Sequence, residues 1–188
     1  MNTHVFHFNV DVTPATTSVL RNQILTAVTQ NNADEIVLLI SSSGGNLDNG
    51  FSTYNFLRSL KKPITAVNTG CVESIANIIF LAADKRVAVN NARFLLHEFH
   101  WGFSAGNVNH SRLREHLESL DFDASRFAEI FEERTASAKT KIDIRKCLHG
   151  DPLIIDSTAA IDAGLVQSIC KPDNIVPVEK AVHWWVNA

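Results

Sequence analysis

The chain has 188 residues with 45% hydrophobic content, enough for one sizeable core, so we expect a single domain over residues 1–188. Its 17 basic and 20 acidic residues give a net charge of -3, and basic residues never cluster beyond Lys61-Lys62, which argues against a nucleic-acid partner. No apolar run has the length of a transmembrane helix, and the first four residues lack the basic start of a signal peptide. We therefore expect a cytoplasmic protein without membrane contact.

Strands and helices alternate along the chain without a linker. Hydrophobic periodicity predicts strands at residues 5–10, 35–40, 64–67, 86–89 and 94–96, and helices at residues 17–29, 47–60, 74–82 and 107–138. The continuous apolar run at 35–40 is typical of a strand with helices on both faces, and the nearly all-apolar helix at 74–82 must be buried. This order indicates an α/β fold.

The predicted helix at 107–138 mixes charged residues with an apolar stripe. Residues of the stripe recur every three or four positions: Leu113, Leu117, Leu120, Phe127, Ile130 and Phe131. One interpretation is a surface helix that packs this stripe on its own core. The other is a protruding helix whose stripe is buried by a second subunit.

Three segments carry side chains or backbone groups suited to acyl transfer. Ser74 follows an apolar strand and a predicted tight turn at Gly70, and it opens a helix whose first amides lack intrahelical partners. A second strand runs into the diglycine Gly44-Gly45, and a third delivers His97. Each feature alone also fits a helix cap, an ordinary turn or a structural histidine, but together they are the parts of a nucleophilic site.

The three cysteines, Cys71, Cys147 and Cys170, form an odd set without metal-ligand spacing. They fit reduced structural thiols in a cytosolic protein. Cys71 is a candidate nucleophile too, although a packed side chain is the simpler interpretation three residues before the helix. The sequence thus predicts neither a metal site nor a cofactor.

At these residues the chain resembles the proteolytic subunit of Clp protease, within the Clp protease and crotonase clan. Ser42-Ser43-Gly44-Gly45 stands where that family has Ser-Pro-Gly-Gly, and the segment from Gly70 to Ile75 stands where it has Gly-x-x-Ala-Ser-Met. The segment from Arg93 to His97 matches the strand that ends in the catalytic histidine. Residues 159–166 look like the last helix and its Gly-Leu-Val exit, so the resemblance covers roughly residues 5–170.

The resemblance implies a stacked-sheet core of ββα repeats, as in Clp protease and crotonase, with a protruding handle helix at about residues 107–138. It implies a serine endopeptidase with Ser74 as nucleophile and His97 as base. The oxyanion would be bound by the amides of Gly45 and Ile75, and the substrate by Gly44, Gly102 and Phe103. It further implies a peptide or unfolded protein as substrate, and a homo-oligomeric ring, with or without ring stacking, that encloses the active sites.

Two departures from the family concern the catalytic residues. Glu73 replaces a small residue beside Ser74, and its carboxylate would oppose a developing oxyanion unless it is paired or points away. The family's catalytic aspartate falls on Pro152, so we assign the role to Asp151, which a one-residue loop insertion would restore. Asp156 is the alternative, but its position before an alanine-rich helix predicts a helix cap. His100 is an alternative base, expected on the opposite strand face if residues 94–101 are extended.

A third departure leaves other functions open. The family's axial segment, which contacts an AAA+ ATPase, has no counterpart before the first predicted strand, so that partner is uncertain from the sequence. A catalytically weak or inactive ring subunit is one alternative, favoured by all three departures. A crotonase-type acyl-CoA enzyme that recruits Glu73 is another, although it gives no reason for Ser74 and His97 to match. A membrane-bound signal-peptide peptidase is disfavoured because no membrane anchor is found.

Overall fold

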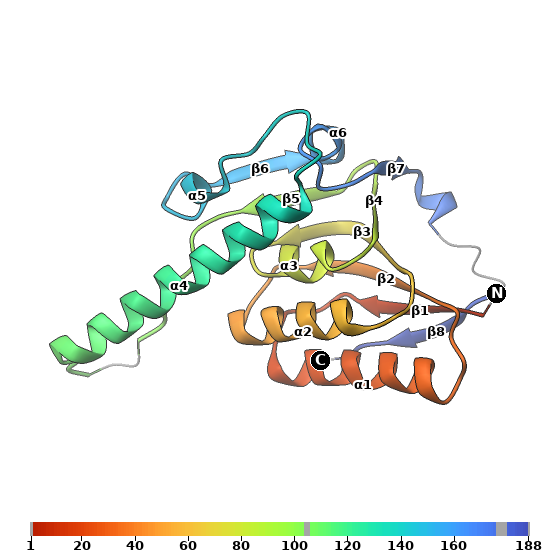
Figure 1. Ribbon diagram of the computed structural model, residues 1–188, viewed down its shortest axis with the longest axis horizontal. Helices are drawn as coiled ribbons and strands as arrows, with labels where there is room; N and C mark the ends of the chain where they lie inside the picture. Colours follow the sequence, from red (N-terminus) through yellow and green to blue (C-terminus); the bar gives the residue numbers. More distant parts are fainter. Residues whose placement is uncertain (1, 104–105, 176–179, 188) are drawn as a thin grey trace.

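The computed structural model describes residues 2–103, 106–175 and 180–187 (Figure 1). Its strands are β1 (Thr3–Phe8), β2 (Glu35–Ser42), β3 (Ile64–Glu73), β4 (Lys85–Val89), β5 (Arg93–Leu96), β6 (Leu153–Asp156), β7 (Ser168–Cys170) and β8 (Val182–Trp185). Its helices are α1 (Pro14–Thr29), α2 (Leu47–Ser59), α3 (Ala76–Leu81), α4 (His110–Arg134), α5 (Ile144–Cys147) and α6 (Ser157–Asp162), followed by a 3-10 turn at Pro172–Asn174. The predicted α/β class is confirmed.

One sheet has the strand order β6-β5-β3-β2-β1-β8 and forks at β3. Residues Thr65–Asn68 of β3 pair with β4, whereas Cys71–Glu73 pair with β5. Buried Asn68 holds the fork, because its side chain donates to the Arg93 carbonyl at 2.8 Å and accepts from the Gly70 N–H at 3.0 Å. The fork brings the end of β5, and therefore His97, beside the residues that precede Ser74.

Strand β3 is longer than the sequence predicted, and the tight turn expected at Gly70 is wrong. After a shift in register between Ile40 and Ser42, β2 pairs again with β3 through Ser42 and Val72. This second stretch of pairing keeps the chain extended as far as Glu73. Strands β6 and β8, at the two ends of this strand order, were not predicted from the sequence.

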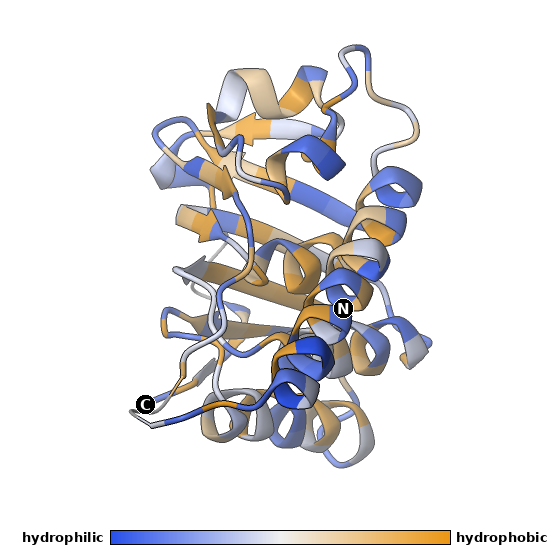
Figure 2. Ribbon diagram, turned by 90° about the vertical axis from the view of Figure 1, so that its left-hand side faces the viewer, coloured by the Kyte–Doolittle hydropathy of each residue, from blue (hydrophilic) through white to orange (hydrophobic). Residues whose placement is uncertain are grey.

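The helices pack on one face of the sheet. Alternating β-strand residues such as Phe6, Leu38 and Ile40 join residues of α1, α2, α3 and α4 in the main core. The other face carries a smaller cluster of Val5, Val37, Leu39, Val67 and Val87, and within the described chain no helix contributes to it. The prediction that helices cover both faces of β2 is therefore wrong. In Figure 2 the hydrophobic colour is concentrated on the strands, and the outer helices are largely hydrophilic.

Helix α4 is divided between core and solvent. Its second half packs on the core through Phe127 and Phe131, each 1% exposed. Its first half projects from the body (Figure 1) and leaves Leu113 and Leu117 49% and 59% exposed. The predicted stripe is thus split, because the subunit itself buries the part of the stripe that lies over α3. Within residues 2–103, 106–175 and 180–187, no helix is both long and apolar enough to span a bilayer.

Candidate functional site

Ser74 lies in a strained turn between β3 and α3. Its φ of 52° is in the left-handed region, which residues with a Cβ rarely adopt. Helix α3 begins two residues later, and its cap residue Ile75 makes no side-chain cap bond, so the interpretation of Ser74 as a helix cap is wrong. The Ser74 N–H donates to the Leu95 carbonyl at 3.0 Å, which continues the β3–β5 ladder up to the turn. Such strain is typical of functional sites.

The side chain of Asn77 holds this turn through two hydrogen bonds. Its buried side-chain amide donates to the carbonyls of Ser74 and Leu95, each at 3.0 Å. Asn77 was not among the site residues predicted from the sequence. The signal was present, since Asn77 is the single polar side chain in the apolar run from Ile75 to Ala83.

The diglycine packs directly against the Ser74 turn. Gly44 and Gly45 have φ values of 95° and 139°. A Cβ on Gly44 would lie only 2.7 Å from the Ser74 Cβ, and a Cβ on Gly45 would collide with the Val12 carbonyl, so both positions require glycine. Among the described residues, neither the Gly45 N–H nor the Ile75 N–H donates a hydrogen bond to the protein. Both amides can therefore bind an external acceptor.

Ser74 and His97 line the same cavity of about 220 Å³, together with Gly45. The remaining lining residues are Ser43, Leu47, Glu98, Phe99 and His100. In the part of the chain that the structure describes, no hydrogen bond joins Ser74 to His97. Strand β5 ends at Leu96, so the extended conformation that would turn His100 away is not present, and the rings of His97 and His100 lie 5.6 Å apart.

The environment of His97 favours its neutral form. Burial lowers the pKa of His97 below the ordinary 6.5, and the charge of His100 lowers it further, while Glu73 and, more weakly, Glu98 raise it. A histidine with a lowered pKa is unprotonated near pH 7 and can accept a proton.

The carboxylate of Glu73 is paired with an arginine. Its Oε1 accepts from Nε and Nη2 of Arg93 at 3.0 and 2.7 Å. The Glu73 side chain is 12% exposed, and the pair links β3 to β5. An arginine partner offsets the charge that would otherwise oppose an oxyanion at Ser74.

The two candidate aspartates have partners away from the cavity. Asp151 forms an ion pair with Lys146 at 2.7 Å and lines a separate hollow with Cys147 and Leu153. Asp156 accepts from the Ala159 N–H at 2.8 Å and caps α6, which confirms the cap that the sequence predicted.

Gly102 and Phe103 lie beyond the cavity and do not form a strand; residues 104–105 lie outside the described chain. Phe103 is half exposed, and its ring contacts that of His116 on α4 at 5.3 Å. Cys71 is half-buried, with its Sγ 3.6 Å from the Ser41 Oγ. It does not line the Ser74 cavity.

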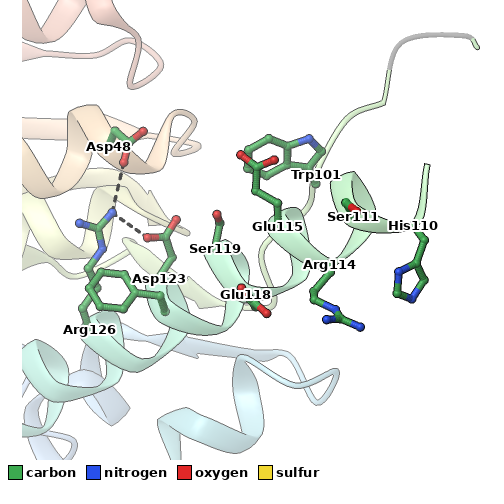
Figure 3. A pocket seen from close by; sticks show the side chains of 11 residues that line it. Asp48, Trp101, His110, Ser111, Arg114, Glu115, Glu118, Ser119, Asp123 and Arg126 are labelled. Atoms are coloured by element: carbon green, nitrogen blue, oxygen red, sulfur yellow. Dashed lines mark hydrogen bonds and ion pairs between the residues drawn. The ribbon is translucent and has the colours of Figure 1, made fainter. Parts of the chain in front are cut away.

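A larger hollow of about 630 Å³ runs along α4 (Figure 3). At its inner end Arg126 pairs with Asp123 at 2.7 Å and with Asp48 at 3.2 Å, and its guanidinium lies 3.6 Å from the centre of the Phe51 ring. Trp101 lies beside Glu115, and His110 lies at the end opposite Arg126. This hollow contains neither Ser74 nor His97. Nowhere in the described residues do three or more histidine, cysteine or acidic side chains gather in a group that could hold a metal ion.

The sequence was compared with known families. The sequence model of the Clp protease family matches residues 2–173. The chain belongs to the Clp protease family. The proteolytic subunit 2 of the ATP-dependent Clp protease from Treponema denticola is 26% identical over 147 residues, which cover 76% of this chain and 69% of that protein. The corresponding subunit 2 from Borreliella burgdorferi is 41% identical over 70 residues, or 36% of this chain and 35% of that protein.

A solved structure of a ClpP1 mutant from Listeria monocytogenes has the same fold. Its TM-score is 0.75 over 92% of this chain and 95% of that chain, at 20% sequence identity. The predicted ClpP-like architecture is therefore confirmed. The Clp family match ends at residue 173, so strand β8 lies outside it.

Proposed function

We propose that this member of the Clp protease family hydrolyses peptide bonds as a serine peptidase, with Ser74 as nucleophile and His97 as general base. The observation that carries the proposal is the strained Ser74 turn, which packs on the diglycine and shares one cavity with His97. A strained nucleophile, a nearby base and unpaired backbone N–H groups are the requirements of acyl transfer.

In this mechanism His97 removes the Ser74 proton as the hydroxyl oxygen attacks the peptide carbonyl. The amides of Gly45 and Ile75 bind the oxyanion, each contributing about 3 kcal/mol in the transition state. His97 then passes the proton to the leaving amine, and water hydrolyses the acyl-enzyme by the same route. Asp151 is the predicted third member of the triad, but its ion pair with Lys146 would have to break before it could reach His97.

The substrate is proposed to be an extended peptide or an unfolded protein, bound by Gly44, Gly102 and Phe103. We further propose a homo-oligomeric ring, with rings in contact through the projecting half of α4, in the cytoplasm. The exposed Leu113 and Leu117 support a subunit contact at this place. An AAA+ ATPase remains a proposed partner, supported by the names of the relatives alone.

A weak or inactive ring subunit is the second candidate. Two observations favour it: Ser74 and His97 are not hydrogen-bonded in the described chain, and Asp151 is bonded to Lys146. Hydrogen bonds of this kind are often long before substrate binds, so the active form remains our proposal. The Clp family match gives no support to a crotonase-type enzyme.

Reaction with a fluorophosphonate probe, followed by mass mapping, tests the proposal. We expect the label on Ser74 and its loss in Ser74→Ala and His97→Ala, with little change in thermal unfolding. Ser59→Ala and His149→Ala, both at exposed positions, are the matched controls and should label like the wild type. Absence of label from the wild type under conditions that label an active serine peptidase would favour the inactive subunit.

A further inference from the structure

The proposed site needs a carboxylate beside His97, and Asp151 is bonded to Lys146 instead. We infer that Glu73, held by Arg93, orients His97 and stabilises its protonated form, in the role that the sequence assigns to Asp151. The inference rests on the proposed function and identifies Glu73 as a positioning residue of the same site.

Strand register places Glu73 beside Arg93 and next to the segment that carries His97. In the parallel β3–β5 pair, Cys71 lies opposite Arg93 and Glu73 lies opposite Leu95. Residues two apart on a strand share a face, so Arg93 is a diagonal neighbour of Glu73. His97 directly follows Leu96, the last residue of β5, and the bond from the Ser74 N–H to the Leu95 carbonyl keeps this end of β5 beside the Ser74 turn. Val72, Phe94 and Leu96 alternate with these residues and are buried in the core on the other face.

A glutamate side chain is long enough to reach a diagonal neighbour on the adjacent strand. Diagonal neighbours on adjacent strands lie about 7–8 Å apart, within reach of long side chains. The bonds from Arg93 demonstrate that Glu73 reaches one of its two diagonals. His97 lies two residues beyond Leu95, which is opposite Glu73, and the charge of Glu73 acts on it.

The second oxygen of Glu73 is free to accept a bond. Both bonds from Arg93 go to Oε1, and within the described residues Oε2 accepts none. The side chain is nearly buried, so solvent screens its charge only weakly. Of the two carboxylates that raise the pKa of His97, Glu73 has the larger effect and the exposed Glu98 the smaller.

Asp151 is disfavoured by its position and its ion pair. Strand β6 is antiparallel to β5, with Leu96 opposite Leu153, and the pairing ends there. Asp151 precedes β6 and lines a hollow with Lys146 and Cys147, apart from the cavity of Ser74 and His97. Its ion pair with Lys146 at 2.7 Å holds it there.

A carboxylate beside His97 would stabilise the charge that forms in the proposed reaction. When His97 takes the Ser74 proton it becomes a cation, and the Glu73 carboxylate accepts a hydrogen bond from the imidazolium without taking a proton. His97 then gives that proton to the leaving amine. Arg93 fixes the Glu73 carboxylate through two hydrogen bonds on the face away from the buried core.

Titration of the His97 imidazole by nuclear magnetic resonance tests this inference without requiring activity. We expect Glu73→Gln to lower the pKa of His97 by about half a unit or more, because a negative neighbour is lost. Arg93→Gln should shift it upward, because the pairing cation is lost. A merely structural role would not give opposite shifts. Glu132→Gln is the matched control, because Glu132 accepts two bonds from Arg145 outside the cavity and its loss should leave the pKa unchanged.

The rate at which the fluorophosphonate probe labels Ser74 gives the second readout. We expect Glu73→Gln to slow labelling at pH 7 by about tenfold or more, and Glu73→Asp to restore part of the rate. An unchanged His97 pKa in Glu73→Gln would overturn the inference, as would a larger shift in Asp151→Asn. If the wild type does not label at all, the proposed function fails, whereas the titration still decides whether Glu73 acts on His97.

Discussion

Backbone strain at Ser74 has a measurable energetic signature. A residue with a Cβ in the left-handed region is disfavoured by about 1–2 kcal/mol, whereas glycine adopts it freely. We therefore expect Ser74→Gly to have a free energy of unfolding about 0.5–1 kcal/mol above that of Ser74→Ala, after allowance for the greater chain entropy of unfolded glycine. Both variants lack the hydroxyl, so urea denaturation isolates the backbone term. An alanine variant as stable as the glycine variant would indicate that the turn is unstrained.

The pKa of His97 predicts the pH dependence of the same site. Burial and His100 lower this pKa below 6.5, and the neutral imidazole is the form that accepts a proton. The rate of Ser74 labelling should therefore rise with pH through a midpoint below 6.5 and be constant near neutral pH. A midpoint clearly above 6.5 would contradict the burial of His97. Rates between pH 4.5 and 8 measure the midpoint.

At the scale of single elements, β8 is held to β1 by aromatic and histidine contacts. The His7 Nε2 and His183 Nδ1 lie 2.9 Å apart, and the Trp184 Nε1 donates to the His4 Nδ1 at 2.9 Å. The Trp185 ring stacks on His7 with centroids 4.9 Å apart. A hydrogen bond between two imidazoles needs one donor and one acceptor, so protonating both rings breaks it.

This contact makes the attachment of β8 sensitive to acid. Burial, and then the charge of His183, lower the pKa of His7, and burial lowers that of His4. A group with a lowered folded pKa contributes its full stability above the unfolded value of about 6.5, and this stability falls as the pH drops toward the folded pKa. We expect β8 amides to lose hydrogen-exchange protection between pH 7.5 and 5.5, after correction for intrinsic rates. His7→Gln should reduce this dependence, and equal protection at both pH values would contradict it.

Buried Arg86 on β4 forms hydrogen bonds to several segments that are distant in sequence. Its guanidinium donates to the carbonyls of Leu165 at 2.8 Å, Arg134 at 3.0 Å, Gly164 at 3.2 Å and Ala83 at 3.3 Å. These carbonyls belong to the ends of α3 and α4 and to the segment after α6. Burial lowers the pKa of Arg86 to about 10, so the group remains charged at neutral pH.

Loss of this arginine should destabilise the entire fold. Arg86→Met leaves buried carbonyls without donors, which we expect to lower the free energy of unfolding by about 3 kcal/mol. Arg58→Met is the control, because its ion pair with Asp84 is exposed and worth less than about 1 kcal/mol. Equal losses in the two variants, measured by urea denaturation, would show that the carbonyls find other partners.

The exposed leucines on the projecting half of α4 predict that several copies of the chain assemble. Leu113 and Leu117 lie one helical turn apart on the projecting half of α4, and burying them in a neighbour would contribute about 25 cal/mol per Å² of apolar surface. The double variant Leu113→Glu with Leu117→Glu should dissociate the proposed ring in light scattering. Leu25→Glu on α1, which is 48% exposed, is the control for a surface charge elsewhere. A wild-type monomer at micromolar concentration would contradict the assembly.

Local sequence patterns were enough to predict the order of most elements and the residues around Ser74. Hydrophobic periodicity is a local property, so β1, β2, α2 and the buried α3 could be predicted within a few residues. The diglycine and His97 each follow an apolar strand, and the structure brings both to the Ser74 cavity. The cap at Asp156 was predictable for the same reason, because a capping side chain bonds to its own helix.

The partners of the charged groups and the strands at the sheet edges depend on contacts between segments distant in sequence. The pairing of Glu73 with Arg93 depends on the register between β3 and β5. A displacement of one residue there reverses the face of every side chain. The burial of Phe127 and Phe131, and the exposure of Leu113 and Leu117, depend on how far α4 overlaps the core. Periodicity gives the apolar face of a helix but not the length over which a neighbour covers it.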